Sequence, residues 1–434
     1  MTRHWVLGLL VGLSMAAARA AEAAPPPPPV CGDPTEMPNP IYIVTGDTQV
    51  PVLKRIGKRF RQLTSGAFTV VYIPTGSCAN LAAMYKTPTD FKATAASGGP
   101  FYIPADPAWD ETSVPPVCTL PTTAPLITAD VGNTIVFADN KNCPTLGPKP
   151  ANVGLFKGPT QGFVFVVPGG PATAGGSTQR GITAEMAYLI MGLGADKAMV
   201  PPWDDRHYIY GRPATKGTQI GIGANIGVDA ATWKLLPNVP MGPTYSFDQS
   251  DDLAAKVAMI DANAEKTLGI LGTEIYDKAT NRAAMHSLAF RGYGQLHGYW
   301  PDSTPTSFDK RNIRDGHYLL WSYVQYIAPI DTGTGQPTKP EVKQLIDAML
   351  ANPLTTTPAF EPLTDIVASG LVPGCAMKVQ RQNEGGTLSL YDAQQPCGCF
   401  FDAKVPGGST SCAVCDTNTP CASGTCRHGY CEAK

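Results

Sequence analysis

From residue 41 onward, short apolar runs alternate with amphipathic segments. Residues 41–44 form a β-branched run typical of a buried strand, and residues 50–63 carry apolar side chains at helical spacing between lysines and arginines. A second strand is predicted over residues 68–73 and a short helix over residues 79–85. Strands and helices that alternate in this way predict a parallel sheet with covering helices.

Further along the chain the pattern first weakens and then returns. Residues 87–125 are rich in proline and have little periodicity, which predicts loops. A second α/β block begins with a strand over residues 162–167 and a helix that Thr183 caps. The elements predicted after it are strands over 207–210, 268–276, 284–290 and 318–327, a helix that begins at 250, and helices over 342–349 and 360–367.

The first residues have the pattern of an export signal. Arg3 precedes an apolar run over residues 5–18, and Ala18 and Ala20 are the small residues that a signal peptidase reads. The run is shorter than a bilayer-spanning helix, so we favour a removed signal over residues 1–24 rather than a membrane anchor. Residues 25–39 begin with five prolines and are assigned to a linker. We therefore expect a periplasmic or secreted protein.

All 12 cysteines lie beyond this signal, and in an oxidising compartment we expect them to form disulfides. Seven of them crowd residues 397–431. So short a segment buries little apolar surface, so we predict a small C-terminal module over 373–434 that disulfides staple together. Among the scattered cysteines, we expect Cys118 to pair with Cys143.

Composition and charge argue against several classes of function. The net charge is −2 and no run of lysine or arginine follows the signal, which argues against nucleic-acid binding. The six histidines follow no zinc-ligand spacing, and no nucleophile stands out beside a base. The close cysteine pairs of the tail could be read as zinc or redox sites, but structural disulfides are favoured in an exported segment. We expect no enzyme activity, no cofactor and no metal.

Three predicted strand-to-helix turns combine glycine with hydroxyl side chains: residues 46–49, 75–78 and 212–218. In an open parallel sheet such turns lie at the carboxyl ends of strands, where ligands bind. Backbone N–H groups at a helix start, together with hydroxyl donors, form a cradle for anions. Arg212 and Lys216 add positive charge to the third turn, and a guanidinium can bind an oxyanion through two hydrogen bonds. Taken singly, each turn favours ordinary helix capping over ligand binding, whereas the two cations are equally consistent with a solvated surface pair.

Taken in order, these elements resemble the periplasmic phosphate-binding proteins of ABC importers, over residues 40–330. The segments that carry the resemblance are the glycine turn at 45–48, the Gly-Ser turn at 75–77 and the segment at 130–134. The family's most specific motif, Arg-x-x-x-Ser-Gly-Thr, is similar to residues 212–218. Lys216 replaces the serine of that motif, and Thr134-Ile135 replaces a Ser-Asp pair whose aspartate accepts a proton from the ligand. Asp47 is the candidate for that acceptor role.

The resemblance implies an α/β, type 2 periplasmic-binding-protein fold, in which two lobes joined by crossover strands close on a solute like a hinged trap. We place one lobe at residues 40–160 and 272–372, and the other at 161–271. The implied ligand is a small oxyanion, phosphate first, and an ABC permease is the implied partner of the monomer. The implied ligand-binding residues are Asp47, Thr48, Gly76, Ser77, Thr134, Arg212, Lys216, Gly217 and Thr218.

An interaction protein is the alternative: a secreted or surface protein with a degenerate binding core and a disulfide-rich adhesion tail. The cysteine spacing over residues 421–431 resembles small knots appended to secreted proteins. The substitutions in the ligand motif favour this alternative, whereas Ser77, Arg212 and Gly217 at the family's spacing argue against it.

Overall fold

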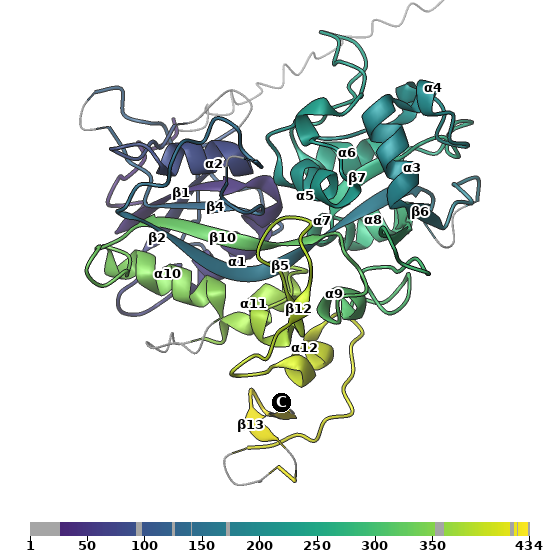
Figure 1. Ribbon diagram of the computed structural model, residues 1–434. Coiled ribbons are helices and arrows are strands. Elements are labelled where there is room, and N and C mark those ends of the chain that lie inside the picture. Colours follow the sequence, from purple (N-terminus) through teal and green to yellow (C-terminus); the bar gives the residue numbers. More distant parts are fainter. Residues whose placement is uncertain are drawn as a thin grey trace, which may run out of the picture.

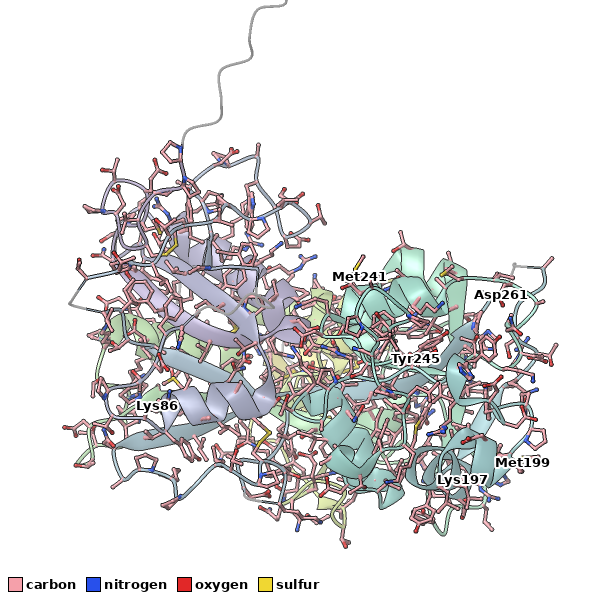
Figure 2. All side chains as sticks on the ribbon, turned by 90° about the horizontal axis from the view of Figure 1, so that it is seen from above. Lys86, Lys197, Met199, Met241, Tyr245 and Asp261 are labelled. Carbon is pink, nitrogen blue, oxygen red and sulfur yellow. A yellow bond between two sulfur atoms is a disulfide. The ribbon has the colours of Figure 1, made fainter. Side chains whose placement is uncertain are left out.

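The computed structural model describes residues 27–92, 98–123, 126–139, 141–170, 174–351, 360–416, 421–422 and 424–432. The predicted export signal lies outside these residues. The described elements form two α/β lobes side by side, with the C-terminal residues below them (Figure 1). Seen from above, Lys86 lies on one lobe, and Met199, Tyr245 and Asp261 lie on the other (Figure 2). In the described part of the chain, no helix has the length and apolar character needed to cross a bilayer.

The first lobe is built on a parallel sheet. Strand β1 (Pro40–Gly46) lies between β2 (Thr69–Thr75) and β4 (Val131–Thr134) and runs parallel to both, and the short β3 (Phe101–Tyr102) pairs antiparallel with β2. Helix α1 (Val50–Arg61) buries its apolar stripe against β2, and α2 (Ser77–Met84) covers β1 and β4. The helices α10 (Pro340–Leu350) and α11 (Pro362–Ala368) pack beside α1. The strand-helix alternation predicted for residues 41–85 is therefore confirmed.

Two long strands connect the lobes. Strand β10 (Trp321–Pro329) lies antiparallel between β4 and β5 (Val153–Pro168). The amino-terminal half of β5 pairs with β10, and its carboxyl-terminal half pairs with β7 (Gly269–Gly272) and β8 (Met285–Ser287) of the second lobe. One strand thus belongs to both sheets, and the predicted crossover arrangement and two-lobed α/β class are confirmed.

The second lobe surrounds the far half of β5. Thr183 accepts a hydrogen bond from the Met186 amide at the start of α3, as predicted, and a π-helical turn over Leu189–Leu193 continues that helix. Residues 207–210, predicted as a strand, instead form a 3-10 turn (Arg206–Tyr208) that leads into one bridge between Ile209 and Leu268. The other elements are β6 (Gly181–Thr183), α3 (Ala184–Tyr188), α4 (Ala195–Ala198), α5 (Gly217–Ile226), a 3-10 turn (Ala230–Thr232), α6 (Ser250–Val257), α7 (Thr273–Tyr276), α8 (Ala279–Ala284), β9 (Ala289–Arg291) and α9 (Arg311–Arg314).

Strand pairing changes where the lobes divide. Strand β8 pairs with the far half of β5, and β9 pairs parallel with β6, so residues 285–291 lie among strands of the second lobe. The sequence-based division assigned residues 272–372 to the first lobe as one block. We propose instead that the chain belongs to the second lobe up to β10, which pairs with β4 of the first lobe.

The C-terminal residues are stapled by four of the six disulfides: Cys375–Cys397, Cys399–Cys412, Cys415–Cys426 and Cys421–Cys431. Their elements are a 3-10 turn (Gly374–Ala376), the hairpins β11 (Val379–Gln380) with β12 (Ser389–Leu390) and β13 (Thr425–Arg427) with β14 (Tyr430–Glu432), and α12 (Gly398–Lys404). Phe400 and Phe401 of α12 are buried in the main core, and Arg314 forms an ion pair with Asp402. The predicted module therefore extends the core rather than standing apart from it.

The predicted pairing of Cys118 with Cys143 is wrong. Cys118 pairs with Cys31, and Cys143 pairs with Cys78. Backbone pairing explains the first bond, since the Cys31 amide donates to the Thr119 carbonyl and brings the linker beside residue 118. The Cys78–Cys143 bond is explained by α2, because its first turn carries Cys78 and the helix packs on β4.

Candidate functional site

The three glycine-containing turns meet between the lobes. Asp47 and Thr48 follow β1, Gly76 and Ser77 stand at the start of α2, and residues 216–218 begin α5 on the second lobe. Together with Gly46, Asn133, Ile135 and Arg212 they line one small cavity of about 10 Å³. That volume is close to the space that a single water molecule needs. We call this group of residues the interlobe corner.

Arg212 is the centre of the interlobe corner and is only 1% exposed. Its Nε donates to the Phe247 carbonyl at 2.8 Å, and Nη2 donates to the Asp248 carbonyl at 2.7 Å. Nη2 also lies 3.1 Å and 3.0 Å from the two carboxylate oxygens of Asp47, on the opposite lobe. Nη1 donates to the Ser250 hydroxyl. Every guanidinium nitrogen therefore has a protein acceptor.

The carboxylate of Asp47 fills the cradle that Arg212 offers. Besides the guanidinium, it accepts a hydrogen bond of 2.9 Å from the Ser250 amide at the first turn of α6. Burial alone would raise the pKa of Asp47, but the charges of Arg212 and Lys216 and the Ser250 amide together lower this pKa below its usual value. The group is therefore a stable anion at neutral pH.

Lys216 forms a second link between the lobes. Its Nζ donates to the carbonyl of Thr75, at the end of β2, at 2.6 Å, and lies 3.3 Å from a carboxylate oxygen of Asp248. The side chain is buried, although the sequence left open a solvated surface position. The lysine that replaces the motif's serine thus spans the gap between the lobes.

Close backbone approach explains the glycine at position 217. A Cβ atom placed there would lie 2.6 Å from the Ser77 hydroxyl and 2.2 Å from a carbon of Ile135, both on the first lobe. A Cβ at Gly76 would lie 3.1 Å from the Lys216 side chain. The lobes can approach this closely only because position 217 carries no side chain.

Thr134 does not belong to the interlobe corner. Its hydroxyl donates to the Val136 carbonyl and accepts from the Val136 amide, both at 3.2 Å. Side chains alternate along a strand, so its neighbours Asn133 and Ile135 line the cavity instead. Sequence reasoning missed Asn133, which accepts from the Gly46 amide at 2.9 Å and donates to the Thr45 hydroxyl at 2.7 Å. The period-two alternation was the signal that could have found it.

Thr48 starts a buried chain of polar side chains that leaves the interlobe corner. Its hydroxyl lies 3.4 Å from Oε1 of Gln161, to which Gln49 also donates. Gln161 in turn donates to a carboxylate oxygen of Glu274 at 3.2 Å. The chain runs from the first lobe, through β5, to α7 of the second lobe.

The interlobe corner contains groups that are able to bind an anion. Its lining offers one guanidinium, one ammonium, the three hydroxyls of Thr48, Ser77 and Thr218, and the starts of α2 and α5, whose first N–H groups have no partner within the helix. The cysteines 415, 421 and 431, whose sulfur atoms lie within 4.8 Å of one another, are all in disulfides and so are not free thiolates.

No protein-family model matches the sequence, and no curated protein matches it. Among solved structures, a putative phosphate ABC transporter substrate-binding protein from Clostridium perfringens is similar at 11% identity, over 77% of this chain and 99% of that one, with a TM-score of 0.48. An ABC-type phosphate transport receptor from Vibrio cholerae is similar at 13% identity, 77% and 100% coverage and a TM-score of 0.45. A phosphate-binding protein from Stenotrophomonas maltophilia is similar at 8% identity, 86% and 99% coverage and a TM-score of 0.42.

Proposed function

We propose that this protein is an extracytoplasmic solute-binding protein that captures a small oxyanion, with phosphate as the first candidate, between its two lobes. The observation that carries the proposal is the Asp47 carboxylate in the cradle of Arg212 and the Ser250 amide. A carboxylate is itself an oxyanion, so this cradle has the charge and the donor geometry that an anionic ligand needs.

Capture requires the lobes to move apart. A cavity of about 10 Å³ has no room for phosphate, so the ligand enters when the lobes rotate about β5 and β10. The anion then takes the place of the Asp47 carboxylate on Arg212 and accepts hydrogen bonds from Ser77 and Thr218. Exchanging one buried ion pair for another costs little free energy, because both arrangements pair the guanidinium.

Asp47 and Lys216 have defined roles in this proposal. A displaced Asp47 carboxylate stays beside the bound anion and accepts a hydrogen bond from its hydroxyl group, which favours hydrogen phosphate over fully ionised sulfate. Lys216 leaves the Thr75 carbonyl and Asp248 to contact the ligand. Delivery to an ABC permease, by a monomer, completes the proposed role.

The interaction protein is the second candidate, and one observation favours it. Each guanidinium nitrogen of Arg212 and the ammonium of Lys216 already bind protein acceptors. In that case the interlobe corner is a permanent clasp, and the protein presents a rigid closed core to a partner outside the cytoplasm.

Calorimetric titration of the mature chain with phosphate and with sulfate separates the candidates. We expect saturable binding of phosphate, and we expect Arg212→Ala to weaken it at least 30-fold, about 2 kcal/mol. Arg206→Ala is the matched control, because Arg206 pairs with Asp196 on the surface of the same lobe. Absence of binding heat, and of thermal stabilisation by phosphate, sulfate or molybdate, would support the interaction protein.

A further inference from the structure

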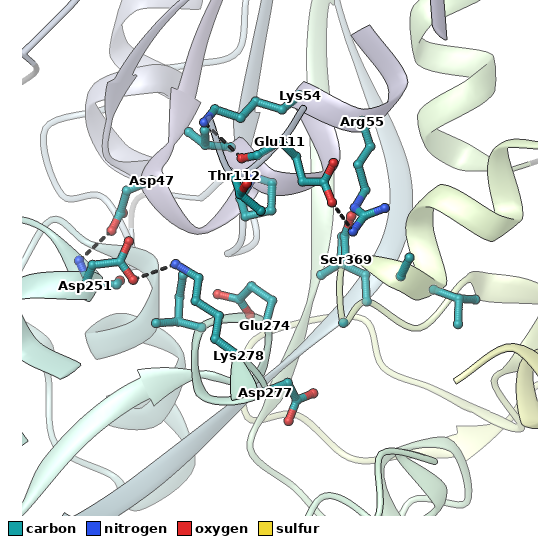
Figure 3. Close-up of a pocket in the computed structure, with 18 of the residues that line it drawn as sticks. Asp47, Lys54, Arg55, Glu111, Thr112, Asp251, Glu274, Asp277, Lys278 and Ser369 are labelled. Carbon is teal, nitrogen blue, oxygen red and sulfur yellow. Dashed lines mark hydrogen bonds and ion pairs between the residues drawn. The ribbon is translucent and has the colours of Figure 1, made fainter. Parts of the chain in front are cut away.

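A second cavity, of about 700 Å³, shares Asp47 and otherwise differs from the interlobe corner (Figure 3). Its volume falls within the usual range of small-molecule sites. Residues from three regions line it. The first lobe contributes α1, β2 and residues 101–115 and 367–371, the second lobe contributes the starts of α6 and α7 and residues 308–310, and the C-terminal region contributes residues 401–406. We call it the three-part cavity.

Apolar side chains make up much of its wall. It includes Tyr72 and Phe101 of the first lobe, Ile275 and Phe308 of the second lobe, and Phe401 of α12. Aromatic and aliphatic walls of this kind stabilise an organic molecule by removing apolar surface from water.

Among the charged side chains that line the three-part cavity, all but Glu274 are paired with an opposite charge or with backbone carbonyls. Figure 3 shows the pairs of Arg55 with Glu111 and of Lys278 with Asp251. Lys54 donates to the carbonyls of Glu111 and Ser113, at 3.1 Å and 3.0 Å. The remaining pairs are Asp47 with Arg212 and Asp277 with Lys310.

Glu274 is the exception, and Tyr72 accompanies it. Glu274 is 5% exposed and Tyr72 is 1% exposed. One Glu274 carboxyl oxygen accepts from Gln161, whereas the other, Oε2, has no hydrogen-bond partner among the described residues. The Tyr72 hydroxyl is equally without a partner in the described part of the chain. Buried polar atoms are rarely left in this state, since each costs free energy until it is paired.

The protonation state of Glu274 decides which ligand chemistry fits. Burial, with the nearby charges of Asp47 and Asp277 adding to it, raises the pKa of Glu274 well above its usual value. The raised pKa favours the protonated carboxyl group, which offers an O–H donor rather than a negative charge. An acceptor oxygen on the ligand satisfies it, and no unpaired charge remains for a charged ligand to neutralise.

We propose that the three-part cavity binds a neutral organic molecule, whose apolar body packs against the aromatic wall and whose hydroxyl or carbonyl oxygen pairs with Glu274 and Tyr72. This site lies beyond the anion function proposed above and does not depend on it. Its wall includes Phe401 and Val405, so it gives the disulfide-stapled C-terminal residues a direct part in ligand binding.

Nile red, a neutral carbonyl-bearing dye that fluoresces in apolar surroundings, is the probe for the test. The mature chain should bind it saturably at one site, and Thr112→Trp should abolish that binding, because Thr112 is an exposed residue at the cavity wall. Acetophenone should displace the dye about tenfold better than cumene, which has a similar size but lacks the oxygen. Benzoate and benzylammonium should not displace it.

The preference for the ketone identifies the polar groups. Tyr72→Phe and Glu274→Leu should each reduce the acetophenone-to-cumene ratio several-fold, and the double variant should bring it close to one. Tyr326→Phe is the matched control, since the Tyr326 hydroxyl is also buried without a partner among the described residues but lies outside the cavity. If Glu274→Leu does not fold, the acetophenone-to-cumene ratio of Tyr72→Phe, compared with that of Tyr326→Phe, still tests the proposal.

Several results would overturn the proposal. They are the absence of saturable dye binding, dye binding that survives Thr112→Trp, displacement by benzoate as effective as by acetophenone, and a ketone preference that Tyr72→Phe leaves unchanged. Phosphate titration of Tyr72→Phe separates the two sites. A protein that fails to bind phosphate but still binds the dye argues against the anion site at the interlobe corner and leaves the three-part cavity supported.

Discussion

The interlobe corner and the three-part cavity meet at Asp47 but are built on opposite principles. In the interlobe corner, cations and acceptors from both lobes are fully paired and almost no space remains. In the three-part cavity, there is space for an organic molecule, and two buried polar atoms have no partner among the described residues. A site that satisfies itself must open to bind, whereas a site with unpaired groups gains free energy as soon as a ligand pairs them.

The contrast extends to the charge on each site's carboxyl group. Asp47 has a guanidinium and an ammonium nearby, so its pKa is lowered despite burial. Glu274 is buried with two further carboxylates nearby, so its pKa is raised. The environment of the same functional group thus favours the ionised form in one region and the protonated form in the other.

Removing the guanidinium from the interlobe corner should have the largest effect on stability. Arg212→Ala leaves the Asp47 carboxylate buried without its partner, and we expect a loss of about 3 kcal/mol in the free energy of unfolding. Urea denaturation measures it. The double variant Arg212→Ala with Asp47→Asn should recover part of the loss, and a double variant no better than Arg212→Ala would show that the pair is not the cause.

Adding a side chain at the contact between the lobes should have an intermediate effect on stability. Gly217→Ala places a Cβ against Ser77 and Ile135, and overpacking of this kind costs about 2 kcal/mol or forces the lobes apart. Thermal unfolding and the radius of gyration in solution scattering report the two outcomes. Gly374→Ala is the control, because no atom lies within 4 Å of a Cβ at that position. A Gly217→Ala protein identical to wild type in both measurements would contradict the closed contact.

The opposite pKa shifts of Asp47 and Glu274 should produce the smallest effect on stability, but this effect depends on pH in a way that distinguishes the two groups. Asp47, with its lowered pKa, stabilises the fold above its usual pKa of 3.8, and this contribution is lost as the pH falls below that value. Glu274, with its raised pKa, carries no penalty at low pH and destabilises the fold progressively as the pH rises above 4.5.

Unfolding free energy measured from pH 3 to pH 8 in two variants tests this difference. Asp47→Asn should flatten the acid side of the profile, and Glu274→Gln should flatten the neutral side, each by an amount on the order of 1 kcal/mol. If Glu274→Gln instead steepened the fall in stability toward neutral pH, the proposed neutral state of Glu274 would be wrong.

Periodicity was sufficient for the elements around β1 and β2. Apolar residues at spacing two and then at spacing 3.6 predicted these strands and the helices α1 and α2 to within a few residues. It failed at residues 207–210, because a short run of alternating side chains is compatible with a 3-10 turn when only one bridge forms. It also could not place residues 285–291 in a lobe, since partner strands distant in sequence decide that.

Local chemistry alone indicated most members of the interlobe corner. Glycine beside a hydroxyl residue after a strand singled out residues 47–48, 76–77 and 217–218, and the charges of Arg212 and Lys216 added weight to the third turn. Thr134 lies outside the interlobe corner, because the face that a strand residue presents depends on the exact register of the sheet. Spacing along the sequence likewise could not predict the disulfide partners of Cys118 and Cys143.

The chain's local order of apolar, hydroxyl and glycine residues was enough to establish an α/β protein with strand-to-helix turns suited to an anion. Only the folded molecule showed that Asp47 neutralises Arg212, that Lys216 crosses between the lobes, and that Tyr72, Glu274 and Phe401 share a cavity. The reason is physical: pairing and cavity formation depend on the distances between residues that lie far apart in the sequence. Those distances are set by the packing of all the elements together.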